Sequence, residues 1–165
     1  MIPGNDPDAP PFVYHAAAKL PLRSAERLLR ESEEHARLRA KEAVAATIRH
    51  LRERGYQVVA SGVIIGNRPL TSPLESILGA HSLIHAAEGE LFRHAVIAGC
   101  EACKVPVSCV PARELYEWGT KSLRVSQDLL RNRLAEAGRG VGKPWAQDQK
   151  ESLLVALVAL ETRRS

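Results

Sequence analysis

One uninterrupted stretch limits the possible folds of this chain more than any other feature. Neither Pro nor Gly occurs from Ala25 to Arg54, and Ser24 precedes the stretch as a candidate N-cap. Val44, Ile48 and Leu51 recur within it at helical spacing. The stretch predicts a single long helix over residues 25–54. Such a helix is about 45 Å long, more than a small domain easily covers, so we expect it to contact a second chain in a homo-oligomer.

Two runs rich in β-branched residues follow this helix, at 56–65 and 105–110, and Gly55 fits the C′ position before the first run. Between the runs, the segment Ser72-Pro73-Leu74-Glu75 has the pattern of a capping box, which predicts a helix reaching about Cys103. A crossover helix between two strands makes them parallel. We therefore predict an α/β fold with a small sheet of parallel strands flanked by helices, the first strand being central.

The remaining segments complete the expected organisation. Helices are predicted from Pro111 to Trp118, ended by Gly119, and then over 123–137 and 145–162, with a loop at 138–144. A short strand is predicted over Phe12–Ala16. Residues 1–21, with a Pro-rich beginning, are expected to be a flexible arm, and residues 22–165 a single domain. No internal repeat is visible.

Composition narrows the class of protein. The net charge of +4 permits contact with nucleic acid, although charges of this size also occur in proteins that bind none. Cys100, Cys103 and Cys109 are odd in number and clustered, unlike the cysteines of a secreted disulfide framework. No signal-peptide pattern is visible, and the apolar run at 153–160 is far shorter than the roughly 20 residues of a membrane span. These features predict a cytoplasmic protein that does not enter the membrane.

The densest group of chemically active side chains is formed by His81, His85 and Glu88. Their i, i+4, i+7 spacing places them on one face of a helix. Two imidazoles at this spacing can share a divalent metal ion, and the carboxylate can be a third ligand or a base. The alternative is a set of hydrogen-bonded structural or substrate-contacting residues, since the His-Glu-x-x-His pattern of zinc proteases is absent.

A second pair of candidate residues opens the last predicted helix. Asp148 and Glu151 are three residues apart, so one helical face presents both carboxylates. Paired carboxylates can hold Mg²⁺ or Mn²⁺. The alternative is an exposed first turn whose acidic side chains interact favourably with the helix dipole.

Residues 56–160 resemble the ribonuclease H-like fold, in particular its Holliday-junction resolvase branch. The resemblance consists of a strand, an Ala-rich helix, a strand ending in Val-Pro-Ala-Arg-Glu, further helices, and a last helix that opens with spaced acids before an Ala/Leu run. It implies that Asp148 and Glu151 are metal-binding acids. The chain departs from the family in two places: no Asp-bearing strand precedes Tyr56, and Gly66-Asn67 stands where a second acid is expected.

Three functions follow from these observations. The first is a non-catalytic or degenerate ribonuclease H-like domain that acts as a nucleic-acid-associated or assembly protein. The second is a metal-dependent nuclease similar to the resolvases, with catalytic Asp148, Glu151 and Glu88 and a shared cleft with His81 and His85. Its phosphate contacts are predicted to be Arg68, Arg113, Lys121, Arg124 and Lys143. The third is a metal enzyme centred on His81, His85 and Glu88.

Overall fold

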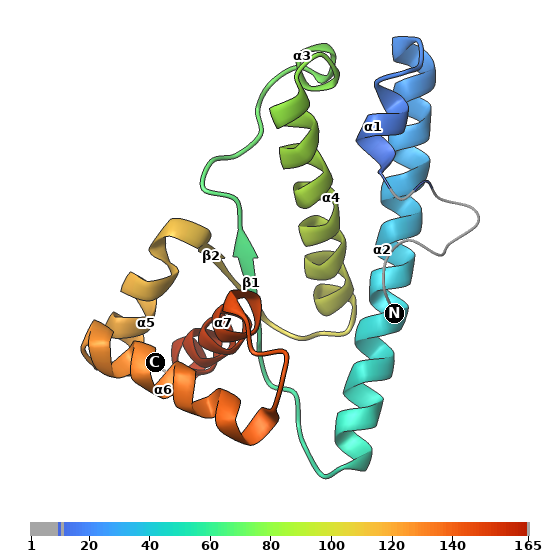
Figure 1. Cartoon of the computed structure of the whole chain (residues 1–165). Coiled ribbons are helices and arrows are strands. Elements are labelled where there is room, and N and C mark those ends of the chain that lie inside the picture. Colours follow the sequence, from blue (N-terminus) through green and yellow to red (C-terminus); the bar gives the residue numbers. More distant parts are fainter. Residues whose placement is uncertain (1–9, 11, 165) are drawn as a thin grey trace. The chain divides into compact units, whose positions relative to one another are not determined.

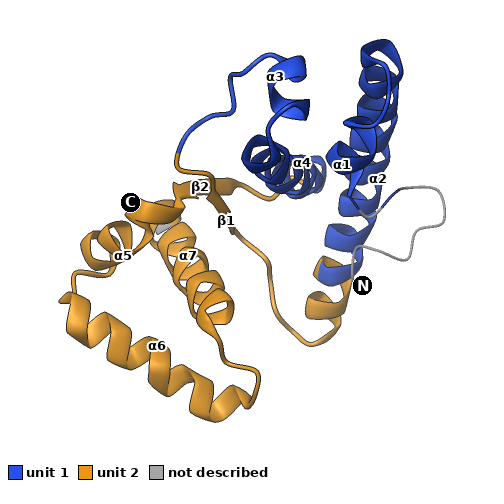
Figure 2. Cartoon of the chain, turned by 45° about the horizontal axis from the view of Figure 1, so that its top comes forward, with its two compact units in different colours: residues 1–47, 68–103 blue, residues 48–67, 104–165 orange. Residues whose placement is uncertain are grey.

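The chain divides into two compact units, where the sequence led us to expect one domain (Figure 2). Unit 1 consists of residues 1–47 and 68–103, and unit 2 of residues 48–67 and 104–165. The computed structural model describes residue 10 and residues 12–164. Of the arm expected at 1–21, residues 1–9 and 11 therefore lie outside the described residues. Each unit is built from two separate stretches of chain.

Unit 1 is helical in its described part. It contains α1 (Val13–Ala17), α2 (Leu22–Glu53) up to residue 47, α3 (Leu74–Leu78) and α4 (His81–Ala102) (Figure 1). The long helix predicted from the sequence is thus confirmed, although it begins after Pro21 and not after Ser24. A small core holds the unit together, and its buried members are Val13, Ala17, Ala25, Leu29 and Leu91.

The segment predicted as a strand over Phe12–Ala16 is a helix, so this prediction is wrong. The Ala16 N–H donates to the Phe12 carbonyl (3.0 Å) and the Ala18 N–H to the Tyr14 carbonyl (2.9 Å). Val13 and Ala17, four residues apart, are both buried. Burial of one helical face outweighs the β propensity of the aromatic and branched residues in this segment.

The predicted helix from Ser72 to Cys103 is two helices. The first, α3, begins after Pro73, and no side-chain hydrogen bond caps it. It ends before Gly79, and α4 begins anew at His81 after the extended residue Ala80. The interruption places His81 in the first turn of a helix, where its side chain is exposed.

Unit 2 contains the sheet. The strands β1 (Ser61–Ile65) and β2 (Val107–Pro111) pair in parallel, with Ser61 opposite Val107 and Ile65 opposite Pro111, which confirms the predicted parallel pairing. The sheet has two strands within the described residues, so the expected central position of the first strand is wrong. The core beside the sheet is supplied largely by helices, and its buried members are Val110, Leu115, Leu130, Leu134, Leu154, Val155 and Val158.

Three helices complete unit 2. After a 3₁₀ turn at Ala112–Glu114 come α5 (Leu115–Leu123), α6 (Gln127–Val141) and α7 (Gln147–Arg164). Gly119 lies inside α5 and Gly138 inside α6, so the predictions that Gly119 ends a helix and that residue 138 begins a loop are wrong. Both glycines are buried, and a Cβ on Gly138 would overlap the indole ring of Trp145.

None of the described helices combines the length and apolarity that a bilayer crossing requires. None of the three cysteines, all of which belong to the described residues, takes part in a disulfide bond. Cys100 is buried, Cys103 half-buried and Cys109 exposed.

Candidate functional site

Two histidines of α4 lie in contact. His81 and His85 are one turn apart, and their Nε2 atoms are 3.0 Å from each other. Their rings stand nearly perpendicular, with centroids 4.4 Å apart. Both side chains are exposed, so an ion can reach them from solvent. Because α4 begins at His81, the pair occupies the first two turns of the helix.

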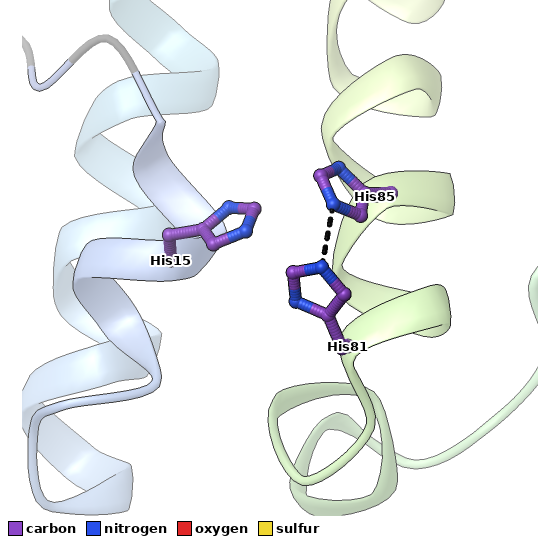
Figure 3. Close-up of side chains that lie close together, drawn as sticks. All are labelled: His15, His81 and His85. Carbon is purple, nitrogen blue, oxygen red and sulfur yellow. Dashed lines mark hydrogen bonds between the residues drawn. The ribbon is translucent and has the colours of Figure 1, made fainter.

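A third imidazole reaches the pair from α1. Figure 3 shows His15 pointing toward His81 and His85 from the opposite helix. Its ring centroid lies 5.6 Å from that of His81 and 4.9 Å from that of His85. One nitrogen from each ring can be chosen so that all three lie within 4.8 Å of one another. Ligands of a tetrahedral zinc ion lie about 3.3 Å apart at Zn–N distances near 2.05 Å, so the imidazoles must approach one another by up to about 1.5 Å to form a three-histidine set.

Glu88 lies behind His15. Its Oε1 atom accepts hydrogen bonds from the backbone N–H of Tyr14 (2.7 Å) and of His15 (3.3 Å), and it lies 3.5 Å from His15 Nδ1. Glu88 is only 7% exposed. Its other oxygen, Oε2, has no hydrogen-bond partner, and neither has His15 Nδ1. The carboxylate therefore contacts the base of the third histidine and the start of α1.

Tyr14 is a further neighbour of this carboxylate. Burial raises the pKa of the Tyr14 phenol above its ordinary value, and the carboxylates of Glu33 and Glu88 raise this pKa further. The phenol therefore stays protonated at neutral pH and adds no negative charge beside Glu88.

The donor set determines which ions fit. Three imidazole nitrogens suit Zn²⁺ and the neighbouring late first-row ions, whereas Mg²⁺ prefers oxygen ligands. A histidine ligand usually donates its second ring N–H to a carboxylate or carbonyl, and Glu88 stands where it can accept from His15. Three protein ligands leave a fourth position for water or substrate, as in catalytic zinc sites.

The three site residues predicted in unit 1 do not all face the same side: His81 and His85 contact each other, whereas Glu88 contacts α1. The structure brings His81 and His85 together, but Glu88 faces α1 and not the open side of the pair, although all three share one helix. His15, which sequence reasoning missed, takes the third position. The only local sign of it was the spacing of Val13 and Ala17, which marks a short amphipathic helix with His15 between them.

The predicted acidic pair lies in unit 2, on α7. Asp148 is exposed, and the half-buried Glu151 accepts a hydrogen bond from Gln147 Nε2 (2.7 Å), which also lies 3.0 Å from the Tyr116 hydroxyl. Among the described residues, the histidine cluster alone brings three or more potential metal ligands together. Within the part of the chain that the structure describes, Asp148 and Glu151 therefore have no third such ligand beside them.

The predicted phosphate-binding residues are all exposed. Arg113 Nε lies 3.3 Å from a carboxylate oxygen of Glu114, and Lys121 Nζ lies 2.6 Å from one of Glu117. Arg68 belongs to unit 1, and the other four belong to unit 2.

Charge is distributed unequally between the units. Unit 2 has 14 Lys and Arg against 8 Asp and Glu, a formal charge of +6. Unit 1 has 9 against 11, a formal charge of −2. The basic excess of the whole chain therefore belongs to unit 2.

The resemblance of residues 56–160 to ribonuclease H-like resolvases stays a prediction from the order of elements and the spacing of Asp148 and Glu151 in the sequence. Comparisons of the chain with models of known protein families, with curated proteins and with solved structures find no match.

Proposed function

We propose that unit 1 is a metal-binding module in which His15, His81 and His85 coordinate a late first-row divalent ion. Zn²⁺ is the ion we use to test this proposal. The observation that supports this is the convergence of three imidazoles from two distant segments of the chain, all with nitrogens within 4.8 Å. The buried carboxylate of Glu88 beside His15 adds support, because a buried negative charge is costly unless it is matched by a cation.

The composition of the set favours an open, catalytic type of site. A bound ion of this kind polarises substrate oxygens and lowers the pKa of a bound water to about 7. The exposed side chains of His81 and His85 leave room for such a ligand. This proposal revises the metal enzyme centred on His81, His85 and Glu88: His15 replaces Glu88 as a ligand.

Zinc titration of the purified full chain tests this function. We expect one Zn²⁺ per chain by calorimetry and no binding of Mg²⁺ at this site. His85→Ala should weaken zinc binding by about 100-fold or more, because two-histidine sites lack one of the three protein ligands. His94→Ala is the matched control, since His94 is an exposed histidine of the same helix near Glu90. Equal zinc affinity in His85→Ala and the unchanged protein would refute the proposal.

For unit 2 we propose nucleic-acid binding without cleavage, on a scaffold that resembles the ribonuclease H-like fold. The supporting observation is the formal charge of +6 in this unit against −2 in the other. Phosphate contacts by Lys and Arg supply most of non-specific nucleic-acid affinity. Binding without cleavage is favoured over the nuclease alternative because Asp148 and Glu151 have no third potential ligand beside them among the described residues.

Fluorescence anisotropy with labelled duplex and four-way-junction DNA tests the second function. Arg124→Gln combined with Lys143→Gln should weaken binding and lower its salt dependence by about two phosphate contacts. Arg27→Gln combined with Arg30→Gln removes the same charge from unit 1 and should have little effect. Equal losses from both double variants would contradict the proposal for unit 2.

The nuclease alternative has its own test. Calorimetry with Mg²⁺ and Mn²⁺, with Asp148→Asn as the variant, compares two proteins of nearly the same shape that differ in one charged oxygen ligand. Metal-dependent cleavage of the junction, lost in Asp148→Asn, would replace the binding proposal by the nuclease. Equal or absent metal affinity in both proteins excludes it.

A further inference from the structure

The short helix α1 depends on Glu88 of another helix for its N-terminal hydrogen bonds. The residue before α1, Phe12, makes no capping hydrogen bond with its side chain. The Glu88 carboxylate instead accepts from the N–H groups of Tyr14 and His15 in the first turn. A helix of five residues is not stable by itself in water, so α1 needs these bonds and the burial of Val13 and Ala17.

The same carboxylate is placed to orient His15. Its Oε1 lies 3.5 Å from His15 Nδ1, and this nitrogen and Oε2 are both buried without a hydrogen-bond partner. If His15 Nε2 binds an ion, its Nδ1 carries the proton, and a shift of about half an ångström makes a hydrogen bond to the carboxylate. The bound ion also supplies positive charge near the buried negative charge of Glu88.

We propose that Glu88 is a positioning residue that couples metal binding to the docking of α1. The ion takes two ligands from α4 and one from α1, and Glu88 holds α1 in place at the same point. Metal binding and docking of residues 12–18 are therefore one reaction: zinc retains α1, and loss of α1 removes a ligand. This inference rests on the proposed metal site. It adds that the affinity of the site for metal depends on whether α1 is docked.

Two substitutions separate the roles of the carboxylate. Glu88→Gln keeps an oxygen that accepts from the two backbone N–H groups and nearly the same volume, but it removes the charge. Glu88→Ala removes both. The zinc affinity of the full-length protein is measured by competition with a chelator, and the order of α1 by hydrogen exchange of residues 13–18, with and without zinc.

We expect zinc to slow the exchange of residues 13–18 in the unchanged protein by up to about 100-fold at a zinc concentration 100 times Kd. Glu88→Gln should leave exchange without zinc nearly unchanged and weaken zinc binding by roughly 10- to 100-fold, as other outer contacts of metal sites do. Glu88→Ala should weaken zinc binding and also speed exchange without zinc. His85→Ala should retain the exchange of the zinc-free protein and lose the effect of zinc.

The outcomes distinguish this inference from the metal site itself. If zinc binds but the exchange of residues 13–18 does not change, the coupling is refuted and the metal site stands. If Glu88→Gln binds zinc as tightly as the unchanged protein, Glu88 only caps α1, and the positioning role is refuted. If zinc does not bind the unchanged protein, the metal site and the coupling both fall.

Discussion

The absence of a side chain at Gly62 allows α7 to pack closely against the sheet of unit 2. At Gly62 in β1, a Cβ atom would overlap the carbonyl oxygen of Val155 and lie 2.9 Å from the Val155 Cγ2 atom. The obstacle is largely the backbone of α7, which cannot rotate away as a flexible side chain can. Glycine is therefore required here for close packing, and its backbone freedom is not the reason.

Gly62→Ala should destabilise unit 2 by about 1–3 kcal/mol, the usual cost of overpacking a core. Gly140→Ala is the control, because a Cβ at Gly140 in α6 meets nothing within 4 Å and alanine favours helix by up to about 1 kcal/mol. Urea unfolding followed by tryptophan fluorescence measures both, since Trp118 and Trp145 lie in unit 2. Equal midpoints for Gly62→Ala and the unchanged protein would contradict the packing argument.

The glycines also show what the sequence could reveal about individual residues. Gly55 has φ +81°, as expected of a residue that follows a helix. Gly119 and Gly138, in contrast, lie inside helices. Glycine is needed at these two positions because the side chains of Leu154 and Trp145 occupy the space that a Cβ would need. The first role depends on local backbone geometry, and the second depends on neighbours that the sequence does not place.

At the scale of elements, local sequence patterns predicted most of the helices but not the contacts between them. The stretch without Pro and Gly gave the long helix correctly, and the crossover predicted the parallel pairing of β1 and β2. The spacing of His81 and His85 also marked a pair on one helical turn. His15 was missed because its approach to α4 depends on tertiary packing of α1.

The beginning of α6 is capped by Ser126, whose Oγ accepts a hydrogen bond from the Leu129 N–H (3.3 Å). Ser126→Ala should lower the free energy of unfolding by about 1 kcal/mol, and Ser126→Gly by only a few tenths. Ser152→Ala, at an exposed position inside α7, is the control and should be nearly neutral. A Ser126→Ala variant as stable as the control would show that the cap contributes nothing.

The pair Glu117–Lys121 gives α5 a measurable pH dependence. The hydrogen bond from Lys121 (2.6 Å) and its charge lower the pKa of Glu117 below its ordinary 4.5. Because folding lowers this pKa, the pair stabilises the fold above the unfolded value, and the contribution is lost as pH falls through the lowered pKa. The effect on stability should be small because both groups are exposed.

Carboxyl titration by NMR tests this prediction. Lys121→Met should return the Glu117 pKa toward 4.5, and Lys143→Met should leave it unchanged. The lowered pKa should also rise in high salt, which screens exposed pairs. A titration of Glu117 that does not respond to Lys121→Met would contradict the assigned cause.

At the scale of the whole molecule, each unit has its own hydrophobic core. We therefore predict that zinc changes the stability of the two units to different extents. Zinc should stabilise unit 1 by about 2.7 kcal/mol at 100 times Kd, since it binds the folded site. Circular dichroism reports the helices of both units, whereas fluorescence reports Trp118 and Trp145 of unit 2. We therefore expect zinc to shift the dichroism transition more than the fluorescence transition, and EDTA to reverse the shift. Coincident transitions with equal shifts would show one cooperative unit.

The predicted self-association also belongs to this scale. The helix α2 has 32 residues, about 48 Å at 1.5 Å per residue, and Leu38 on it is 56% exposed. We expect a dimer at micromolar concentration by light scattering, converted to a monomer by Leu38→Glu. Leu160→Glu on α7, where the side chain is 40% exposed, is the control. A monomeric unchanged protein would remove this prediction.

The place of α7 in the chain has a consequence for biosynthesis. Leu154, Val155 and Val158 of α7 complete the core to which Val110 of β2 belongs. On the ribosome, both strands emerge long before this helix, so their apolar side chains stay uncovered until about residue 158 has left the exit tunnel. The segments of unit 1 are already available once residue 103 has emerged. Nascent chains halted between these points should therefore be the ones that chaperones bind, because the segments of unit 1 have all emerged while the core of unit 2 is still uncovered.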